Sequence, residues 1–136
     1  MQYISEEEFR KQPIEVQKVF IDWWRPSMGD LYTYSYEEDS ASINCCNSKT
    51  QIEQTNRWKG LEIGQRTPLF TEGQLREFIE KKTNCKINVA YEDAEIIIRL
   101  DDLKSYEFKR IFNNLDNDLL QALWQVALKI AKENIH

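Results

Sequence analysis

The residues whose types and spacing could support metal chemistry lie in the second half of the chain. Asp93 and Asp101 or Asp102 are followed by Glu107-Phe-Lys109. Carboxylates on neighbouring strands can hold Mg²⁺, and a nearby lysine can orient or activate water, which is how metal-dependent nucleases cut. Charged residues that alternate along a solvated strand give the same short pattern. A metal-dependent nuclease is therefore kept as an alternative, with these weak catalytic candidates: Asp93, Asp102, Glu107 and Lys109.

The cysteines and the histidine argue against other common site chemistries. Cys45 and Cys46 are adjacent, whereas zinc sites use C-x₂-C pairs with further Cys or His ligands. The only histidine is His136 at the chain end, and Ser–His–Asp or Cys–His catalysis needs an internal imidazole. The four glycines lack the spacing of a phosphate-binding loop. We expect no metal site, no cofactor and no enzymatic activity.

A tyrosine-rich segment is the best candidate for a small-ligand site. Residues 31–36 are rich in strand-forming types, and alternation along a strand places three tyrosines on one face. The predicted ligand-binding residues are Tyr32, Tyr34 and Tyr36.

Three helices with apolar stripes position the remaining candidates. Helices are predicted over 14–24, 72–82 and 117–134. On the first, Trp23 falls within the apolar arc, while Trp24 falls at its edge and is the interface candidate. The last helix, predicted to be capped by Asp116, has an apolar arc of about 200°, wider than one sheet face requires. It is therefore either central to the fold or shared with a partner subunit, with Trp124 and Leu128 as interface candidates.

The strands complete an α+β prediction. They are expected over 31–36, 86–90 and 95–100, and residues 104–112 fit a helix or a strand, with a strand slightly favoured. Residues 41–67 suggest either one or two short strands or a mobile excursion. The predicted fold is a single domain over residues 1–136, with a small antiparallel sheet of about three to five strands packed against three main helices.

Composition narrows the class of partner and the compartment. The formal charge of −5 argues against direct nucleic-acid binding, although Lys81, Lys82, Lys86 and Arg110 could form a local basic patch. No apolar run reaches transmembrane length, and the first twenty residues lack a signal-peptide core. Three sparse cysteines fit a reducing compartment. We expect a cytoplasmic protein with no membrane association.

Three strings of the sequence resemble a known group of proteins. They are VQKVFIDWWRPSMGDL (16–31), PLFTEGQLREFI (68–79) and DLLQALWQVA (118–127), about a third of the chain. In this order and spacing they resemble small uncharacterised proteins carried by phages and prophages of Gram-positive, clostridia-like bacteria. The resemblance implies an accessory phage gene expressed in a host bacterial cell, and it assigns no activity to any residue.

These observations lead to one main hypothesis and three alternatives. The main hypothesis is a non-enzymatic accessory protein that binds a host or phage protein, with inhibition of host defence as one role. It rests on an acidic, compact chain without catalytic groups, and on the apolar surface expected at Trp24 and on the last helix. The alternatives are a structural homodimer formed through the last helix, the metal-dependent nuclease, and a small-ligand binder at the tyrosines.

Overall fold

The computed structural model describes residues 2–34 and 42–135, and it confirms the α+β class. Within the described residues it contains five helices and two antiparallel three-stranded sheets. The prediction of one sheet is therefore wrong. Contacts divide the chain into two compact units. The N-terminal unit is Ser5–Phe70, and the C-terminal unit comprises the residues from Thr71 onward with the first few residues of the chain. The single domain stays a prediction, and each unit is described by itself.

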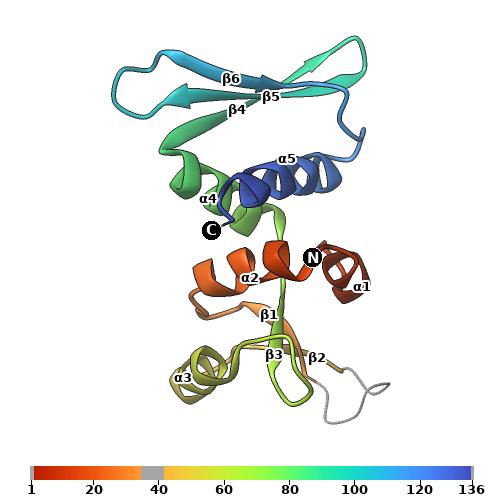
Figure 1. The fold of residues 1–136 in the computed structure, drawn as a ribbon, viewed down its shortest axis with the longest axis vertical. Helices are drawn as coiled ribbons and strands as arrows, with labels where there is room; N and C mark the ends of the chain where they lie inside the picture. Colours follow the sequence, from red (N-terminus) through yellow and green to blue (C-terminus); the bar gives the residue numbers. More distant parts are fainter. Residues whose placement is uncertain (1, 35–41, 136) are drawn as a thin grey trace. The chain divides into compact units, whose positions relative to one another are not determined.

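The N-terminal unit combines three helices with a small sheet of strand order β2-β1-β3 (Figure 1). Its elements are α1 (Glu6–Arg10), α2 (Ile14–Trp23), β1 (Leu31–Tyr34), β2 (Ser42–Cys45), α3 (Lys49–Trp58) and β3 (Arg66–Leu69). Strand β3 contains Pro68, which cannot donate to a ladder and so fits an edge strand. Tyr32 and Thr33 of the central strand β1 point to opposite faces of the sheet, and both are buried.

An aromatic cluster forms the core of this unit. The ring of Phe9 lies 6.1 Å from each of the rings of Phe20 and Phe70, and the last two lie 5.5 Å apart. Their tilted and edge-on arrangements are the ones that aromatic pairs prefer. The three rings come from α1, from α2 and from the residue that follows β3, so the cluster joins these elements.

The structure reverses the roles predicted for the two tryptophans. Trp24 is 1% exposed and its indole Nε1 donates to Asp30 Oδ2 at 3.1 Å, whereas Trp23 is half-buried against Phe70. The prediction assumed that the helix continues through Trp24. The helix ends at Trp23, and Trp24 has extended backbone angles, so helical spacing no longer sets its direction. Trp24 is therefore a core residue and is not available as an exposed interface anchor.

Residues 42–67 contain a helix that the sequence analysis did not predict. Ser48 caps α3, because its hydroxyl accepts the N–H of Gln51 at 3.2 Å. The side chain of Gln51 in turn accepts the N–H of Asn47 at 2.6 Å. The spacing Ser48-x-x-Gln51 is a capping-box signal that was available in the sequence. The helix has almost no apolar stripe, since Thr55 is its only buried residue, and periodicity therefore did not reveal it.

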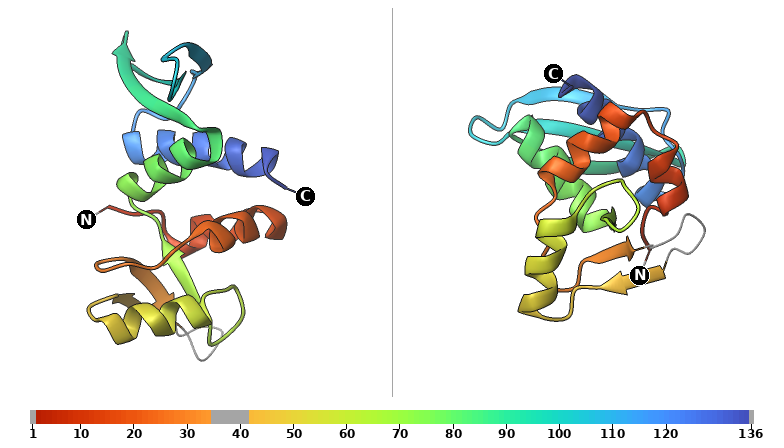
Figure 2. Two further views of the ribbon diagram at one scale, coloured as in Figure 1. Left: turned by 90° about the vertical axis from the view of Figure 1, so that its left-hand side faces the viewer. Right: turned by 60° about the horizontal axis from the view of Figure 1, so that its bottom comes forward.

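The C-terminal unit packs two helices on one face of a meander sheet of strand order β4-β5-β6 (Figures 1 and 2). Its elements are α4 (Glu72–Thr83), β4 (Cys85–Glu92), β5 (Glu95–Asp102), β6 (Phe108–Phe112) and α5 (Leu119–Glu133). The predicted helices and the favoured strand over 104–112 are confirmed here, with the turn extended to Glu107. The cap of α5 is Asp118, which accepts the N–H of Gln121 at 3.1 Å, and not the predicted Asp116.

Helix α5 is central to the fold. Eight of its fifteen residues are buried, among them Leu123 at 0% exposure and Trp124 at 3%. Leu128 is half-buried. Of the two explanations offered for the wide apolar arc, burial within the chain accounts for it. The interface prediction for Trp124 is therefore not supported by an exposed side chain.

The β4–β5 turn predicts a stabilising substitution. Asp93 and Ala94 both have positive φ, 48° and 64°, which a two-residue type I′ hairpin requires. The left-handed conformation costs an alanine roughly 1–2 kcal/mol, and glycine avoids most of that cost. Ala94→Gly should raise the free energy of unfolding by about 1 kcal/mol in urea titration. Ala90→Gly, in the adjacent strand β4, should lower it by about 0.5–1 kcal/mol. Equal losses for both variants would contradict the turn assignment.

Candidate functional site

The structure separates the residues of the predicted nuclease set. Asp93 lies in the turn where β4 meets β5, and Asp102 lies at the opposite end of β5. Seven residue steps of about 3.3 Å place the two ends of β5 about 23 Å apart. Asp93 and Asp102 therefore cannot share one metal ion. Among the described residues, no group of three His, Cys, Asp or Glu side chains is placed to hold a metal.

Asp102 instead organises the turn that joins β5 to β6. Its Oδ1 accepts the N–H groups of Lys104 at 2.9 Å and Ser105 at 3.0 Å. Its backbone N–H donates to the carbonyl of Glu107 at 2.7 Å, and its carbonyl accepts the N–H of Tyr106 at 2.9 Å. The carboxylate thus acts as a local substitute for a backbone acceptor, as aspartates commonly do in turns.

This geometry predicts an acid-sensitive turn. The N–H groups of Ser105 and then Lys104 stabilise the charged form and lower the pKa of Asp102 below its ordinary value of 3.8. A lowered folded pKa means that the stabilisation is present at neutral pH and is lost as pH falls through the folded value. In an NMR titration, the amide signals of Lys104 and Ser105 should move with a midpoint below the ordinary aspartate value. Asp102→Asn should abolish that titration, and a midpoint above the ordinary value would contradict the assignment.

A β-bulge directs two cationic side chains toward the helices. Leu100 pairs with Arg110 and Asp101 pairs with Phe108, so Lys109 is the extra residue in β6. Bulges of this kind re-aim side chains. Arg110 and Lys109 both line a pocket of about 400 Å³ between the sheet, α4 and α5, with Lys82, Thr83, Cys85, Leu100, Asp102, Ile130, Glu133 and Asn134.

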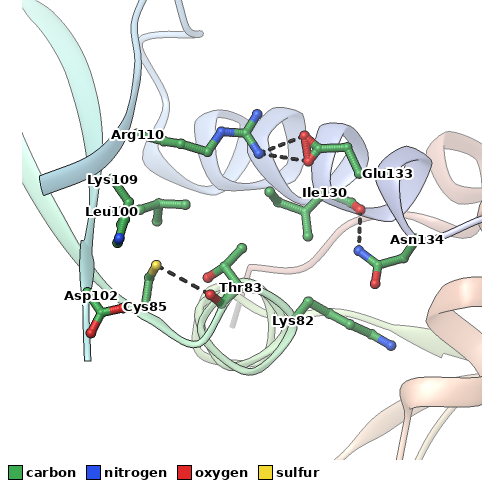
Figure 3. A pocket seen from close by; sticks show the side chains of 10 residues that line it. All are labelled: Lys82, Thr83, Cys85, Leu100, Asp102, Lys109, Arg110, Ile130, Glu133 and Asn134. Carbon is green, nitrogen blue, oxygen red and sulfur yellow. Dashed lines mark hydrogen bonds and ion pairs between the residues drawn. The ribbon is translucent and has the colours of Figure 1, made fainter. Parts of the chain in front are cut away.

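The pocket is dominated by an ion pair from β6 to α5. Arg110 Nη1 donates to both carboxylate oxygens of Glu133, at 2.6 and 2.7 Å (Figure 3). Figure 3 also shows Asp102 and Lys109 on the opposite side of the pocket from Lys82. Two of the predicted catalytic candidates, Asp102 and Lys109, therefore share a pocket, while Glu107 lies exposed in the adjoining turn.

The predicted tyrosine groove contains a cation from the chain itself. The Arg66 guanidinium lies 5.0 Å from the ring centroid of Tyr32 and 5.4 Å from that of Tyr34. Its Nη1 donates to Thr55 Oγ1 at 2.6 Å. Tyr34 and Arg66 line an open pocket of about 460 Å³ with Gln54, Trp58 and Gly64. Tyr32 is buried, and Tyr36 lies outside the described residues. Arg66 thus occupies the position over the rings that a cationic ligand would take.

Within the part of the chain that the structure describes, the densest run of exposed apolar side chains along the sequence lies on β6 and the turn before it. Leu103, Tyr106, Phe108 and Ile111 are 53%, 77%, 51% and 53% exposed, and we call these four residues the β6 strip. Single exposed apolar residues are common, but four within nine residues make this region a candidate interaction surface. Phe108 and Ile111 share the face of the sheet opposite α4 and α5, where they pair with Asp101 and Arg99.

The turn presents its part of the β6 strip in a fixed and strained conformation. Tyr106 has φ +60°, a region that large side chains rarely adopt. The hydrogen bonds to Asp102 and one from the N–H of Glu107 to Ser105 Oγ at 3.3 Å hold this shape. Arg99 covers the ring of Phe108 at 5.2 Å and pairs with Asp101 at 2.7 Å. Backbone strain of this kind is found mainly at sites whose local conformation serves a function.

The sequence analysis did not select the β6 strip, although a signal was present. If residues 104–112 form a strand, Phe108 lies two positions from the charged Arg110 and next to Lys109. In a regular strand Phe108 and Arg110 would share one face, because side chains alternate between faces. A face that carries a charged residue at the edge of a sheet stays in contact with water, so Phe108 would be exposed with it.

Comparisons with protein-family models, curated proteins and solved structures found no match for this α+β chain. Among the helices that the structure describes, none has the length and apolar character needed to cross a membrane.

Proposed function

We propose that this protein is a non-enzymatic accessory protein of a phage or prophage that acts in the host cytoplasm by binding a host or phage protein. Inhibition of host defence is one role within this proposal. The observation that supports binding is the β6 strip, which places four large exposed apolar side chains on one edge strand and its turn. The phage setting is supported by the sequence resemblance alone.

The chemistry of the β6 strip favours a protein partner over a nucleic acid. Tyr106 and Phe108 are aromatic, and aromatic residues anchor many protein interfaces. Nucleic-acid binding would need a basic surface that neutralises phosphates, whereas the chain carries a formal charge of −5. The β6 strip therefore replaces Trp24 and Trp124 as the proposed contact region, because those two side chains are buried.

Affinity capture from lysates of clostridia-like bacteria tests this proposal. The tagged native chain should capture a specific protein, and Phe108→Ser or Tyr106→Asn should reduce its recovery at least about tenfold, which corresponds to 1.4 kcal/mol. Asparagine is chosen at Tyr106 because it tolerates positive φ.

The matched control is Tyr91→Ser, because Tyr91 is 67% exposed but lies near the far end of β4. It should capture the protein as the native chain does. Phe108→Ser and Tyr91→Ser should unfold within about 0.5 kcal/mol of the native chain, since they change exposed side chains, and Tyr106→Asn should not lower the free energy of unfolding. Equal recovery with native and Phe108→Ser chains would contradict the proposal, as would recovery of background proteins only.

A further inference from the structure

We propose that the partner contributes an extended segment that pairs with β6 as a fourth strand, and that this segment alternates acidic and apolar side chains. This inference rests on the proposed protein-binding function and specifies its mode. Three observations support it: the edge position of β6, the different chemistry of its two faces, and the charge around Phe112.

Strand β6 has an exposed edge. In the described residues it pairs with β5 only, and residues Phe108 to Ile111 are all exposed. An edge strand carries backbone N–H and C=O groups that can pair with another strand. Extended peptides use such edges in many complexes, where the backbone provides affinity and alternate side chains provide specificity.

The two faces beside this edge differ in chemistry. On the face opposite the helices, a paired strand would meet the apolar side chains of Phe108 and Ile111. On the helix face it would meet Lys109 and Arg110, which the bulge turns toward the pocket (Figure 3). Because side chains alternate between faces along a strand, the incoming segment should place apolar residues on one face and acidic residues on the other.

Charge around Phe112 favours acidic residues. Arg110 and Lys129 lie 4.8 and 5.5 Å from the centre of the Phe112 ring, and Lys109 precedes Arg110. Glu133 and Asp102, which line the same pocket, offset two of these three cations, and the edge keeps a positive net charge. This local charge is opposite in sign to the formal charge of −5 for the whole chain.

The same charges argue against a second copy of this chain as the occupant. Two β6 strands that pair antiparallel about their centres would place Arg110 opposite Arg110 of the other copy. They would also set the cationic Lys109 opposite the apolar Ile111 of the other copy. Like charges directly opposite one another destabilise a strand pair. A separate partner with acidic side chains fits this edge better.

The test uses the full chain and a synthetic heptapeptide in which valine or isoleucine alternates with glutamate. Binding is followed by NMR of the isotope-labelled chain. The peptide should shift the amide signals of β6, and a version with lysine in place of glutamate should bind at least about tenfold more weakly. On the chain, Lys109→Glu should weaken binding about tenfold, while Lys86→Glu on the opposite edge strand β4 should leave it unchanged.

Backbone methylation of the peptide separates strand pairing from side-chain docking. Two peptides carry N-methyl groups at alternate backbone positions, offset by one residue. One set of N–H groups would face β6 and the other would face away, so one peptide should lose binding and the other should keep it. Equal binding by both would overturn strand addition.

The remaining outcomes also decide the inference. No binding by the unmethylated peptide, or equal binding by its lysine version, would overturn the proposed partner chemistry. Light scattering that shows a dimer, lost in Ile111→Lys, would make a second copy the occupant and overturn the inference. None of these results depends on affinity capture from a lysate, so failure here and failure of the proposed function can be told apart.

Discussion

Trp24→Ala should lower the free energy of unfolding by about 3–5 kcal/mol, the range for removing a large buried aromatic side chain. Trp24 is 1% exposed, and its indole N–H donates to Asp30 Oδ2 at 3.1 Å. The same Asp30 oxygen accepts the N–H of Ser27 at 3.0 Å, so the indole belongs to a small hydrogen-bonded turn. The lost stability has two causes. The truncation leaves a cavity in the core, and the Asp30 carboxylate loses one of its hydrogen-bond donors.

Two further variants separate these contributions. Trp24→Phe keeps most of the ring but removes the donor to Asp30, and should cost about 1.5–3 kcal/mol, the range for a hydrogen bond to a charged group. Trp58→Ala removes the same residue type from a 54% exposed position and should cost much less. Urea titration monitored by circular dichroism measures all three. Similar losses for Trp24→Ala and Trp58→Ala would contradict the core assignment.

Leu123→Ala should lower the free energy of unfolding by about 2.7–5 kcal/mol. Leu123 is 0% exposed and lies in the middle of α5, which packs with α4 and with β5. The neighbouring α4 residues Phe78 and Ile79 are also fully buried, so the helix pair has little room to close a cavity.

The control for this prediction is Leu128→Ala. Leu128 is half-buried on the same helix, so its truncation should cost clearly less than that of Leu123.

Comparing urea midpoints at two protein concentrations also tests the homodimer alternative, because a dimer is stabilised by mass action. A midpoint that rises with concentration in the native chain and not in Leu128→Ala would favour the homodimer over the present account.

The elements that could be predicted are those whose own sequence determines them. Helices α2, α4 and α5 have regular apolar spacing, and Gln74 Oε1 accepts the N–H of Thr71 at 2.9 Å, which completes a capping box at the start of α4. The left-handed Asn84 ends α4 where the sequence indicated. Helix α3 lacks such spacing, because only Thr55 is buried, and it was missed.

The errors arose where tertiary packing overrides local spacing. The assignment of Trp23 to the core and Trp24 to the surface failed because the helix ends one residue earlier than the wheel assumed. The single sheet failed because β3, with Pro68, pairs with β1, while β4 to β6 form a second sheet. No local pattern in a sequence fixes which strands share a sheet.

The candidate site was only partly predictable for a similar reason. Asp102 and Lys109 were selected for metal chemistry, and they do share a pocket. Lys109 is the extra residue of the bulge in β6, and its direction toward this pocket is a property of strand register. Register depends on the turn at Asp102, whose hydrogen bonds involve Lys104 and Ser105 and leave no periodic trace in the sequence.

Amide hydrogen exchange on the chain bound to its captured partner tests the central claim most directly. In the chain alone, the amides of β6 that face away from β5 should exchange rapidly, because an edge strand leaves them without a backbone partner. Binding should slow exchange in β6 and at Tyr106, while leaving the turn at Ala94 unchanged. Unchanged exchange in β6, with protection elsewhere on the chain, would contradict the proposal that this strand and its turn form the binding surface.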